Sequence, residues 1–181
     1  MRARNQISLL WELVEYRLAL NPQRLWSGSC FEWMATMPLP ERNELGENLV
    51  AGWLAAKGFD VERSPDSQAD RIVNGRRAEI RFSTLWRGGF FKFQQFRDQD
   101  YDIAICLGVS PFDAHCWAID KRDLFKAFRA NKVEHQHGGK RGTDTWWFTV
   151  QPPDNVPSWL VGHGGRLTEA FAALKKLAGT R

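Results

Sequence analysis

The sequence is poor in cysteine and has no long apolar run. Its 181 residues include three cysteines, with no CxxC pair and no histidine at zinc-binding spacing. This small, odd number favours buried thiols in a reducing compartment over a disulfide framework. No apolar stretch reaches the roughly 18 residues that a membrane span needs, and acids interrupt the apolar residues of the first twenty positions, unlike a signal peptide. We therefore expect a cytoplasmic protein with no membrane partner.

Several catalytic signatures are also missing. The chain has no GxSxG, HExxH, P-loop or dinucleotide-binding fingerprint, and no internal repeat or low-complexity segment. These absences argue against the enzyme classes that those motifs define. An excess of charge is missing too: the net charge is +4, with a pI of about 9.1. Such a balance permits a phosphate-rich partner such as DNA without requiring one.

What is present is the composition of a folded domain, with 43% hydrophobic and 25% charged residues. Nine tryptophans are scattered along the chain; most should pack in the core, and one or two could stack on nucleic-acid bases. Apolar spacing predicts an amphipathic helix at 7–18 within an N-terminal helical extension, residues 1–38. That helix could cover the core or contact a second subunit. We expect residues 39–181 to form one compact unit.

Within that unit, helices and strands alternate. The pattern predicts a helix at 41–57 capped by Gly58, a strand at 59–63, a hairpin near 70–83 and an aromatic and polar connector at 90–100. Strands at 101–109, 114–120 and 145–151, and helices at 121–130 and 167–177, complete it. This order favours an α/β (α+β) fold with a central mixed β-sheet flanked by helices.

The stretch DRIVNGRRAEIRF, residues 70–82, predicts a tight hairpin. Asn74 and Gly75 suit the two central positions of a type I′ turn, which both need positive φ. Counting outward from this turn places Asp70 opposite Glu79, with Cβ atoms roughly 5 Å apart. Facing carboxylates repel unless a cation or a proton lies between them, and carboxylate oxygens are natural ligands for Mg²⁺.

Alternation on the second strand predicts a half-buried surface. Ala78, Ile80 and Phe82 would meet the core, while Glu79 and Arg81 would share the polar face with Asp70. The alternative to a metal is a set of cross-strand salt bridges, because four arginines lie nearby: Arg71, Arg76, Arg77 and Arg81.

With the preceding helix included, residues 44–84 resemble the core of the PD-(D/E)xK nuclease superfamily, whose members include restriction endonucleases and Holliday-junction resolvases. A glutamate-bearing helix leads through GFDV to the aspartate of a hairpin, and the returning strand carries acid-x-base followed by Ser83 and Thr84. The resemblance implies that Glu47 (or Glu44, one turn earlier), Asp70 and Glu79 hold the metal. Arg81 stands where the family usually has lysine.

The resemblance implies a Mg²⁺-dependent DNA endonuclease of restriction, defence or repair type, with Mn²⁺ as a possible substitute and a homodimer as a possible assembly. Arg81 cannot act as a general base, but it can stabilise charge on a phosphate, and Lys92 could supply the missing ammonium. The alternatives are a catalytically inactive DNA-binding or scaffolding protein on the same fold, and a subunit that docks through the 7–18 helix.

Two further segments are candidates for contacts to DNA. The stretch at 92–102 resembles a glutamine-bearing family element, so Gln94 or Gln95 could orient water or contact a phosphate, and Arg97 could hold the backbone. The glycine-rich loop at 134–144 gathers His137, Lys140 and Arg141, where backbone amides and cations could approach phosphates. Its histidines lack a third ligand at zinc spacing.

Overall fold

The computed structural model describes residues 25–130, 134–135 and 145–179. The predicted helix at 7–18 and three candidate DNA contacts, His137, Lys140 and Arg141, lie outside the described residues. None of the helices in the described part is long and apolar enough to cross a membrane.

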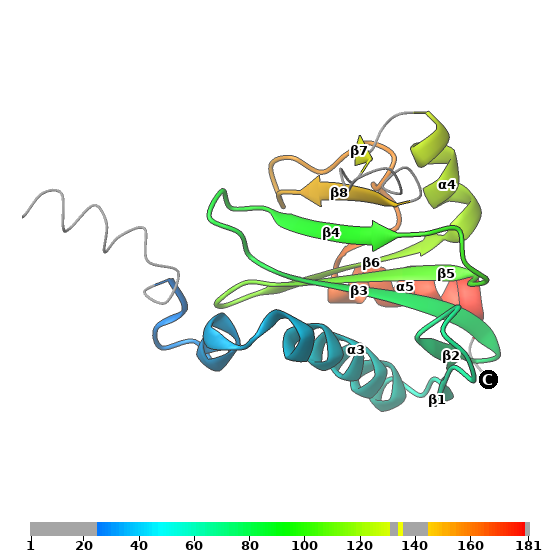
Figure 1. Ribbon diagram of the computed structural model, residues 1–181, viewed down its shortest axis with the longest axis horizontal. Coiled ribbons are helices and arrows are strands. Elements are labelled where there is room, and N and C mark those ends of the chain that lie inside the picture. Colours follow the sequence, from blue (N-terminus) through cyan, green and yellow to red (C-terminus); the bar gives the residue numbers. More distant parts are fainter. Residues whose placement is uncertain (1–24, 131–133, 136–144, 180–181) are drawn as a thin grey trace, which may run out of the picture.

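A mixed six-stranded sheet forms the centre of the molecule (Figure 1). Its strand order is β1-β2-β3-β5-β6-β9; β3 and β5 run parallel, and the other neighbours pair antiparallel. This architecture confirms the predicted α+β fold with a central mixed sheet. The strands are β1 (Val61–Arg63), β2 (Arg71–Val73), β3 (Arg76–Thr84), β5 (Ile103–Val109), β6 (Ala114–Asp120) and β9 (Gly164–Arg166).

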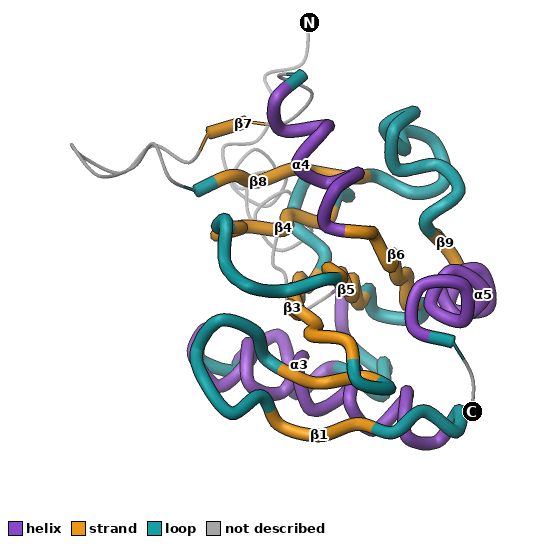
Figure 2. The backbone as a smooth tube through the Cα atoms, turned by 90° about the vertical axis from the view of Figure 1, so that its right-hand side faces the viewer, coloured by secondary structure: helices purple, strands orange, loops and turns teal. Residues whose placement is uncertain are grey.

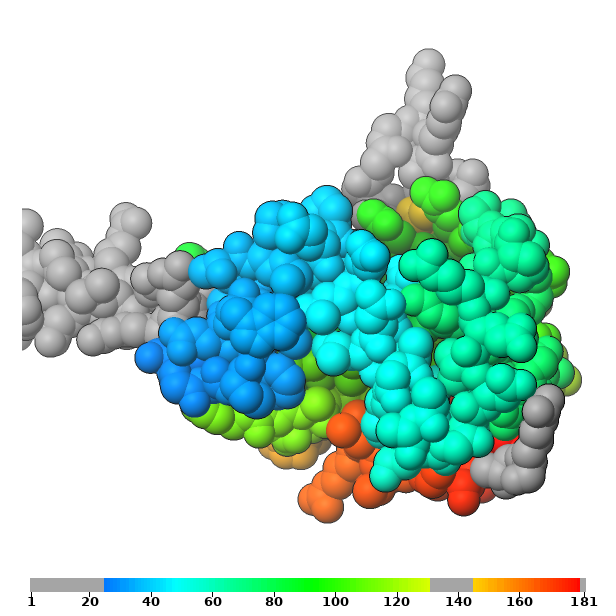
Figure 3. All heavy atoms as spheres, turned by 90° about the horizontal axis from the view of Figure 1, so that it is seen from below, coloured from blue at the N-terminus to red at the C-terminus, as the bar shows by residue number. Residues whose placement is uncertain are grey.

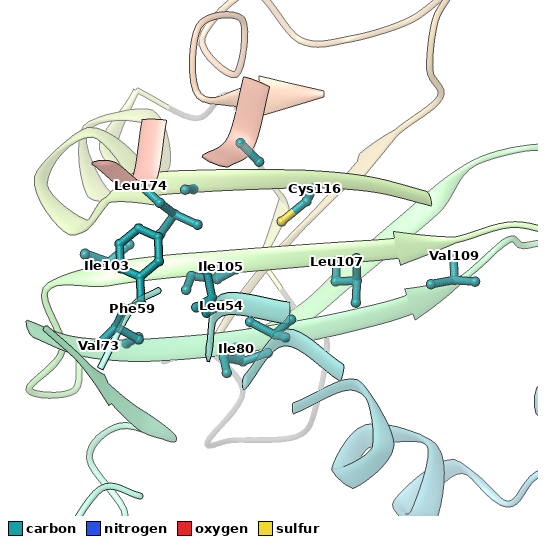
Figure 4. Close-up of a cluster of buried hydrophobic side chains, with 14 of the residues drawn as sticks. Leu54, Phe59, Val73, Ile80, Ile103, Ile105, Leu107, Val109, Cys116 and Leu174 are labelled. Carbon is teal, nitrogen blue, oxygen red and sulfur yellow. The ribbon is translucent and has the colours of Figure 1, made fainter. Parts of the chain in front are cut away.

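Two helices, α3 (Leu39–Ala56) and α5 (Leu167–Ala178), cover one face of this sheet. Alternate residues of β3, β5 and β6 pack there against apolar side chains of both helices, such as Leu54 and Leu174 (Figure 4). Figure 3 shows α3 lying across this face, with α5 at its edge. The helix predicted at 41–57 is therefore confirmed, and Gly58 follows its end with a φ of +86°.

A second layer covers the opposite face, as Figure 2 shows. It consists of the short helix α4 (Lys121–Arg129) and a three-stranded antiparallel sheet, β4 (Phe91–Phe96), β8 (Trp146–Val150) and β7 (Glu134–His135). The expectation of a connector at 90–100 was wrong, because β4 is a strand whose three phenylalanines are buried. A 3₁₀ turn, η1 (Glu32–Thr36), precedes α3.

The predicted hairpin is confirmed in turn and register. Asn74 and Gly75 have φ values of +48° and +80°, and Arg71 lies opposite Ala78, as counting from the turn requires. The predicted alternation is confirmed, since Ala78 and Ile80 pack in the core, but the expectation that the other face of the strand is only half-buried was wrong. Glu79 is only 3% exposed, because the second layer covers the face on which its side chain lies.

Close packing of α3 on β3 fixes the helix that carries Glu47. A Cβ atom placed on Gly46 would lie 2.2 Å from the Cβ of Phe82, so only glycine allows this approach. The neighbouring helical glycine, Gly52, has no heavy atom within 4 Å of the same position.

These two glycines should respond oppositely to alanine. Gly46→Ala should lower the free energy of unfolding by about 1–3 kcal/mol through overpacking against Phe82. Gly52→Ala should raise it by about 0.5–1 kcal/mol, because alanine restricts the unfolded chain and favours the helix. Urea denaturation of both variants beside the wild type measures this, and equal responses would contradict the close contact.

Candidate functional site

A groove of about 710 Å³ runs between α3, the end of β3, the turn at 85–90 and β4. Among the described residues, its lining includes Glu47 from α3, Arg81 from β3, and Lys92, Gln94 and Gln95 from β4. Asp70 and Glu79 do not line the groove, but both contact Arg81, which does. The predicted site residues of α3, the hairpin and β4 therefore gather at one place.

The guanidinium of Arg81 lies among four oxygen atoms. It donates hydrogen bonds to the Glu79 carboxylate, to the Ile80 carbonyl at 2.9 Å and to the Gln95 carbonyl at 3.0 Å. Its Nη1 atom lies 3.8 Å from Oδ2 of Asp70. The two acids are thus brought together, with a cationic side chain of the same hairpin between them.

Backbone hydrogen bonds fix the position of Asp70. Its N–H donates to the carbonyl of Ala78, the residue that pairs with Arg71, at 3.0 Å. Its Oδ2 atom accepts a hydrogen bond from the Ile80 N–H at 2.7 Å. The carboxylate therefore points along β3 toward Arg81 and Glu79.

Glu79 is the most strongly perturbed acid of the site. Burial disfavours its charged form and, with the nearby charges of Asp70 and Glu47, raises its pKa to about 7; the Arg81 guanidinium acts in the opposite direction. Burial and, after it, the charge of Glu79 also raise the pKa of Tyr101, whose hydroxyl has no hydrogen-bond partner among the described residues. A cation at this position would offset the cost of burying the charged Glu79 and its repulsion from Asp70 and Glu47.

The raised pKa of Glu79 predicts a pH-dependent stability difference. The folded protein holds a proton that the unfolded chain releases near pH 4.5, so stability is greatest below that pH and falls as pH rises to about 7. Relative to Glu79→Gln, the wild type should lose up to about 3 kcal/mol of unfolding free energy across this range. Chemical denaturation in several buffers measures it. Exposed Glu62→Gln is the control, and parallel profiles for wild type and Glu79→Gln would contradict the burial argument.

Glu47 meets a different arginine. Its Oε2 atom lies 3.3 Å from Nη1 of Arg71, whose Nη2 donates to the Asn48 side chain at 3.1 Å. Burial and the charge of Asp70 raise the pKa of Glu47. Glu44 is exposed and is not among the residues that line the groove, whereas Glu47 is. No group of three or more His, Cys, Asp or Glu in the described ranges is placed to hold one metal ion. Glu47 therefore does not form a three-carboxylate metal group with Asp70 and Glu79.

Strand β4 places its polar residues unequally. A bulge between Phe93 and Phe96 gives Gln95 a φ of +63°, and its carbonyl reaches Arg81. The Lys92 ammonium lies over two indole rings, those of Trp147 at 3.8 Å and Trp86 at 5.4 Å. The sequence analysis considered Lys92 as the cation beside the acids, but in the structure Arg81 contacts them.

Arg97, which follows β4, and two other arginines of the hairpin lie apart from the two acids. Arg97 is exposed and is not among the residues that line the groove. Arg76 and Arg77 pair with Asp102 and with Asp66, away from the two acids. Of the salt bridges predicted as the alternative to a metal, Arg81 makes one within its own strand, with Glu79, and one across the hairpin, at 3.8 Å from Asp70.

Sequence reasoning missed three groove and support residues. Arg42 lines the groove and donates to the Met37 carbonyl at 2.7 Å and to the Thr84 hydroxyl at 3.2 Å. Trp86 lines the groove with 46% of its surface exposed, and Arg71 links β2 to α3. The glycines that follow Trp86 were the only sign in the sequence that this tryptophan lies at a turn. No neighbouring residue in the sequence indicates that Arg42 lines the groove.

Comparison with known proteins establishes the fold. No known protein family matches the chain, and no curated protein matches it. Among solved structures, the chain is similar to a bacterial homing endonuclease, with 13% sequence identity and a TM-score of 0.50. The match covers 78% of this chain and 94% of that one. At this identity the likeness shows the fold alone: this chain shares the fold of a nuclease.

Proposed function

We propose that this protein is a DNA endonuclease that hydrolyses phosphodiester bonds with a divalent metal ion, Mg²⁺ or Mn²⁺. The observation that carries the proposal is the ring of oxygen atoms around the Arg81 guanidinium. Arg81 lines a groove whose charged residues, among those described, are mostly cationic. The fold is shared with a homing endonuclease, which supports this choice. Membership of the PD-(D/E)xK superfamily, and a restriction, defence or repair type, are parts of the same proposal.

The donor atoms fit a hard cation. Asp70, Glu79 and the Ile80 carbonyl present oxygen atoms that already converge on one positive group, and Mg²⁺ commonly binds through one or two carboxylates with water and substrate phosphate. We propose that Asp70 and Glu79 hold the ion directly, with Glu47 beside them to orient a coordinated water. When bound, the ion activates a water and stabilises charge on the phosphate.

Arg81 then has a role in place of the family lysine. Since its guanidinium stays charged at any relevant pH, it cannot accept the proton of the attacking water. It can donate two hydrogen bonds to the phosphate that undergoes attack and stabilise the charge that develops there. This role requires the guanidinium to exchange its contacts with Asp70 and Glu79 for contacts with the phosphate. Gln94 and Gln95 in the groove, together with the loop residues His137, Lys140 and Arg141 and the exposed Arg97, would position the strand.

A second function rests on the same contact. If Arg81 keeps its hydrogen bond to Glu79 when DNA is bound, the guanidinium permanently replaces the metal, and the protein binds DNA without cutting it. Such a protein would serve as a DNA-binding or scaffolding component. Cleavage activity distinguishes the two functions.

The experiment is a cleavage assay with the full chain. Supercoiled plasmid, linear duplex, single-stranded and branched DNA, and an RNA of matched sequence are incubated with Mg²⁺, with Mn²⁺ or with EDTA. The proposal predicts cleavage of DNA with either metal and none with EDTA, restored by excess Mg²⁺. DNA binding without cleavage under every condition would instead support the binding protein, and cleavage that persists in EDTA would overturn the metal-dependent mechanism. Size-exclusion chromatography with and without DNA tests the proposed homodimer.

A further inference from the structure

Trp86 lines the groove from the turn at 85–90. Its backbone N–H donates to the Phe90 carbonyl at 2.9 Å, and the backbone N–H of Gly89 donates to the Trp86 carbonyl at 2.9 Å. Its ring stacks on Phe90, with centroids 5.9 Å apart and an interplanar angle of 21°. A Cβ atom on Gly88 would lie 2.5 Å from the Phe90 ring, so this turn requires glycine. The turn thus fixes the backbone of Trp86 and the Phe90 ring supports its indole, while 46% of the residue's surface stays exposed.

The groove beside this indole carries positive charge. Among the residues that the structure describes, its lining includes four cationic side chains and one carboxylate, that of Glu47. The four are Arg42, Arg81, Arg87 and Lys92. Lys92 lies over both Trp86 and Trp147, so cation and aromatic ring adjoin at the same point. A nucleic-acid strand offers the matching pair of groups, a phosphate for the cation and a flat base for the ring.

We propose that Trp86 stacks on an unpaired base of the DNA strand whose phosphate lies at Arg81. This inference rests on the proposed endonuclease function and names its substrate class: DNA with an unpaired or displaced base next to the bond that is cut. In a fully paired duplex both faces of each internal base are covered by its neighbours, so an aromatic platform gains contact only where a base has left the stack. Stacking on an aromatic ring depends little on base identity, so the preference concerns DNA structure and not sequence.

The test measures binding, separately from cleavage, with labelled DNA and Ca²⁺ in place of Mg²⁺. Fluorescence anisotropy compares a fully paired duplex with the same duplex carrying one unpaired nucleotide. The wild type should bind the second about tenfold more tightly, as expected for one base stacked on an aromatic ring. Trp86→Ala should abolish this difference, and Trp86→Phe should retain part of it. Trp33→Ala is the matched control, because Trp33 is 50% exposed but does not line the groove.

Each outcome decides the inference. A tenfold preference that disappears in Trp86→Ala and persists in Trp33→Ala supports it, provided that both variants melt at the wild-type temperature. Equal binding of the two DNAs by the wild type, or a preference that survives in Trp86→Ala, overturns the stacking role while leaving the endonuclease proposal in place. If wild type binds neither DNA, the proposed function fails, and the inference fails with it.

Discussion

Replacing Asp70 by Asn is expected to lower DNA cleavage by about a thousandfold or more, because an ion bound through this carboxylate contributes several kcal/mol of transition-state stabilisation. Asparagine keeps an oxygen atom that can accept the Ile80 N–H, which Asp70 binds at 2.7 Å. The hairpin should therefore keep its register, and the loss should lie in catalysis and not in folding. Single-turnover cleavage of plasmid at saturating protein measures the effect.

Two controls make this result specific. Glu44→Gln removes an exposed carboxylate of α3, one helical turn before Glu47, and should cleave DNA at nearly the wild-type rate. Binding of Asp70→Asn to DNA should stay within about threefold of wild type, because the groove cations that hold the backbone are unchanged. Cleavage by Asp70→Asn within tenfold of wild type would show that this carboxylate does not hold the ion.

Replacing Arg81 should separate metal binding from catalysis. In Arg81→Met the oxygens of Glu79, Asp70 and Ile80 lose the guanidinium that now occupies them, so Mn²⁺ should bind more tightly. Cleavage should nevertheless fall by about a hundredfold or more, because the phosphate loses a donor that stabilises its developing charge. Titration with Mn²⁺ and single-turnover cleavage of the same variant measure the two effects.

Lysine at the same position tests the choice between an active and an inactive site. Arg81→Lys keeps the charge but loses the forked pair of donors, so cleavage should fall by about tenfold or more. A gain of cleavage in Arg81→Lys would show that arginine blocks the site and would favour the DNA-binding protein. Arg129→Lys, on an exposed position of α4, is the control and should behave as wild type.

The hairpin was predictable because its determinants are local. Asn74 and Gly75 favour a turn whose geometry fixes the register of the pairs that follow, so the pairing of Arg71 with Ala78 followed from counting residues. Glu47 was distinguished from Glu44 only in three dimensions, where Arg71 and the contact of Gly46 with Phe82 orient the helix.

Two strands, β4 of the second layer and β9 of the central sheet, were not predictable because their determinants are not local. In β4 the alternation of Phe91 and Phe93 breaks at the bulge before Phe96, so period-two spacing fails where the strand turns Gln95 toward Arg81. Strand β9 contains Gly164, which pairs with β6 because it lacks a Cβ atom; one placed there would lie 2.3 Å from the Cys116 carbonyl. Strand propensity does not register such a residue.

The burial of Glu79 depends on the second layer, whose packing over this face of the sheet the sequence did not predict. From the hairpin alone its side chain belonged to an open polar face, where its pKa would be ordinary. The second layer excludes water from Glu79. This burial raises the pKa to about 7, although the hydrogen-bonded Arg81 guanidinium acts in the opposite direction.

The most direct measurement is Mn²⁺ binding by electron paramagnetic resonance, with the full chain and a short DNA duplex. If Asp70 and Glu79 hold the cation beside the phosphodiester, the wild type should bind Mn²⁺ at a site that competes with Mg²⁺. The double variant Asp70→Asn, Glu79→Gln should lose that site while still binding the duplex. Identical Mn²⁺ binding by both proteins, or no binding by the wild type with DNA present, would contradict the metal-dependent mechanism.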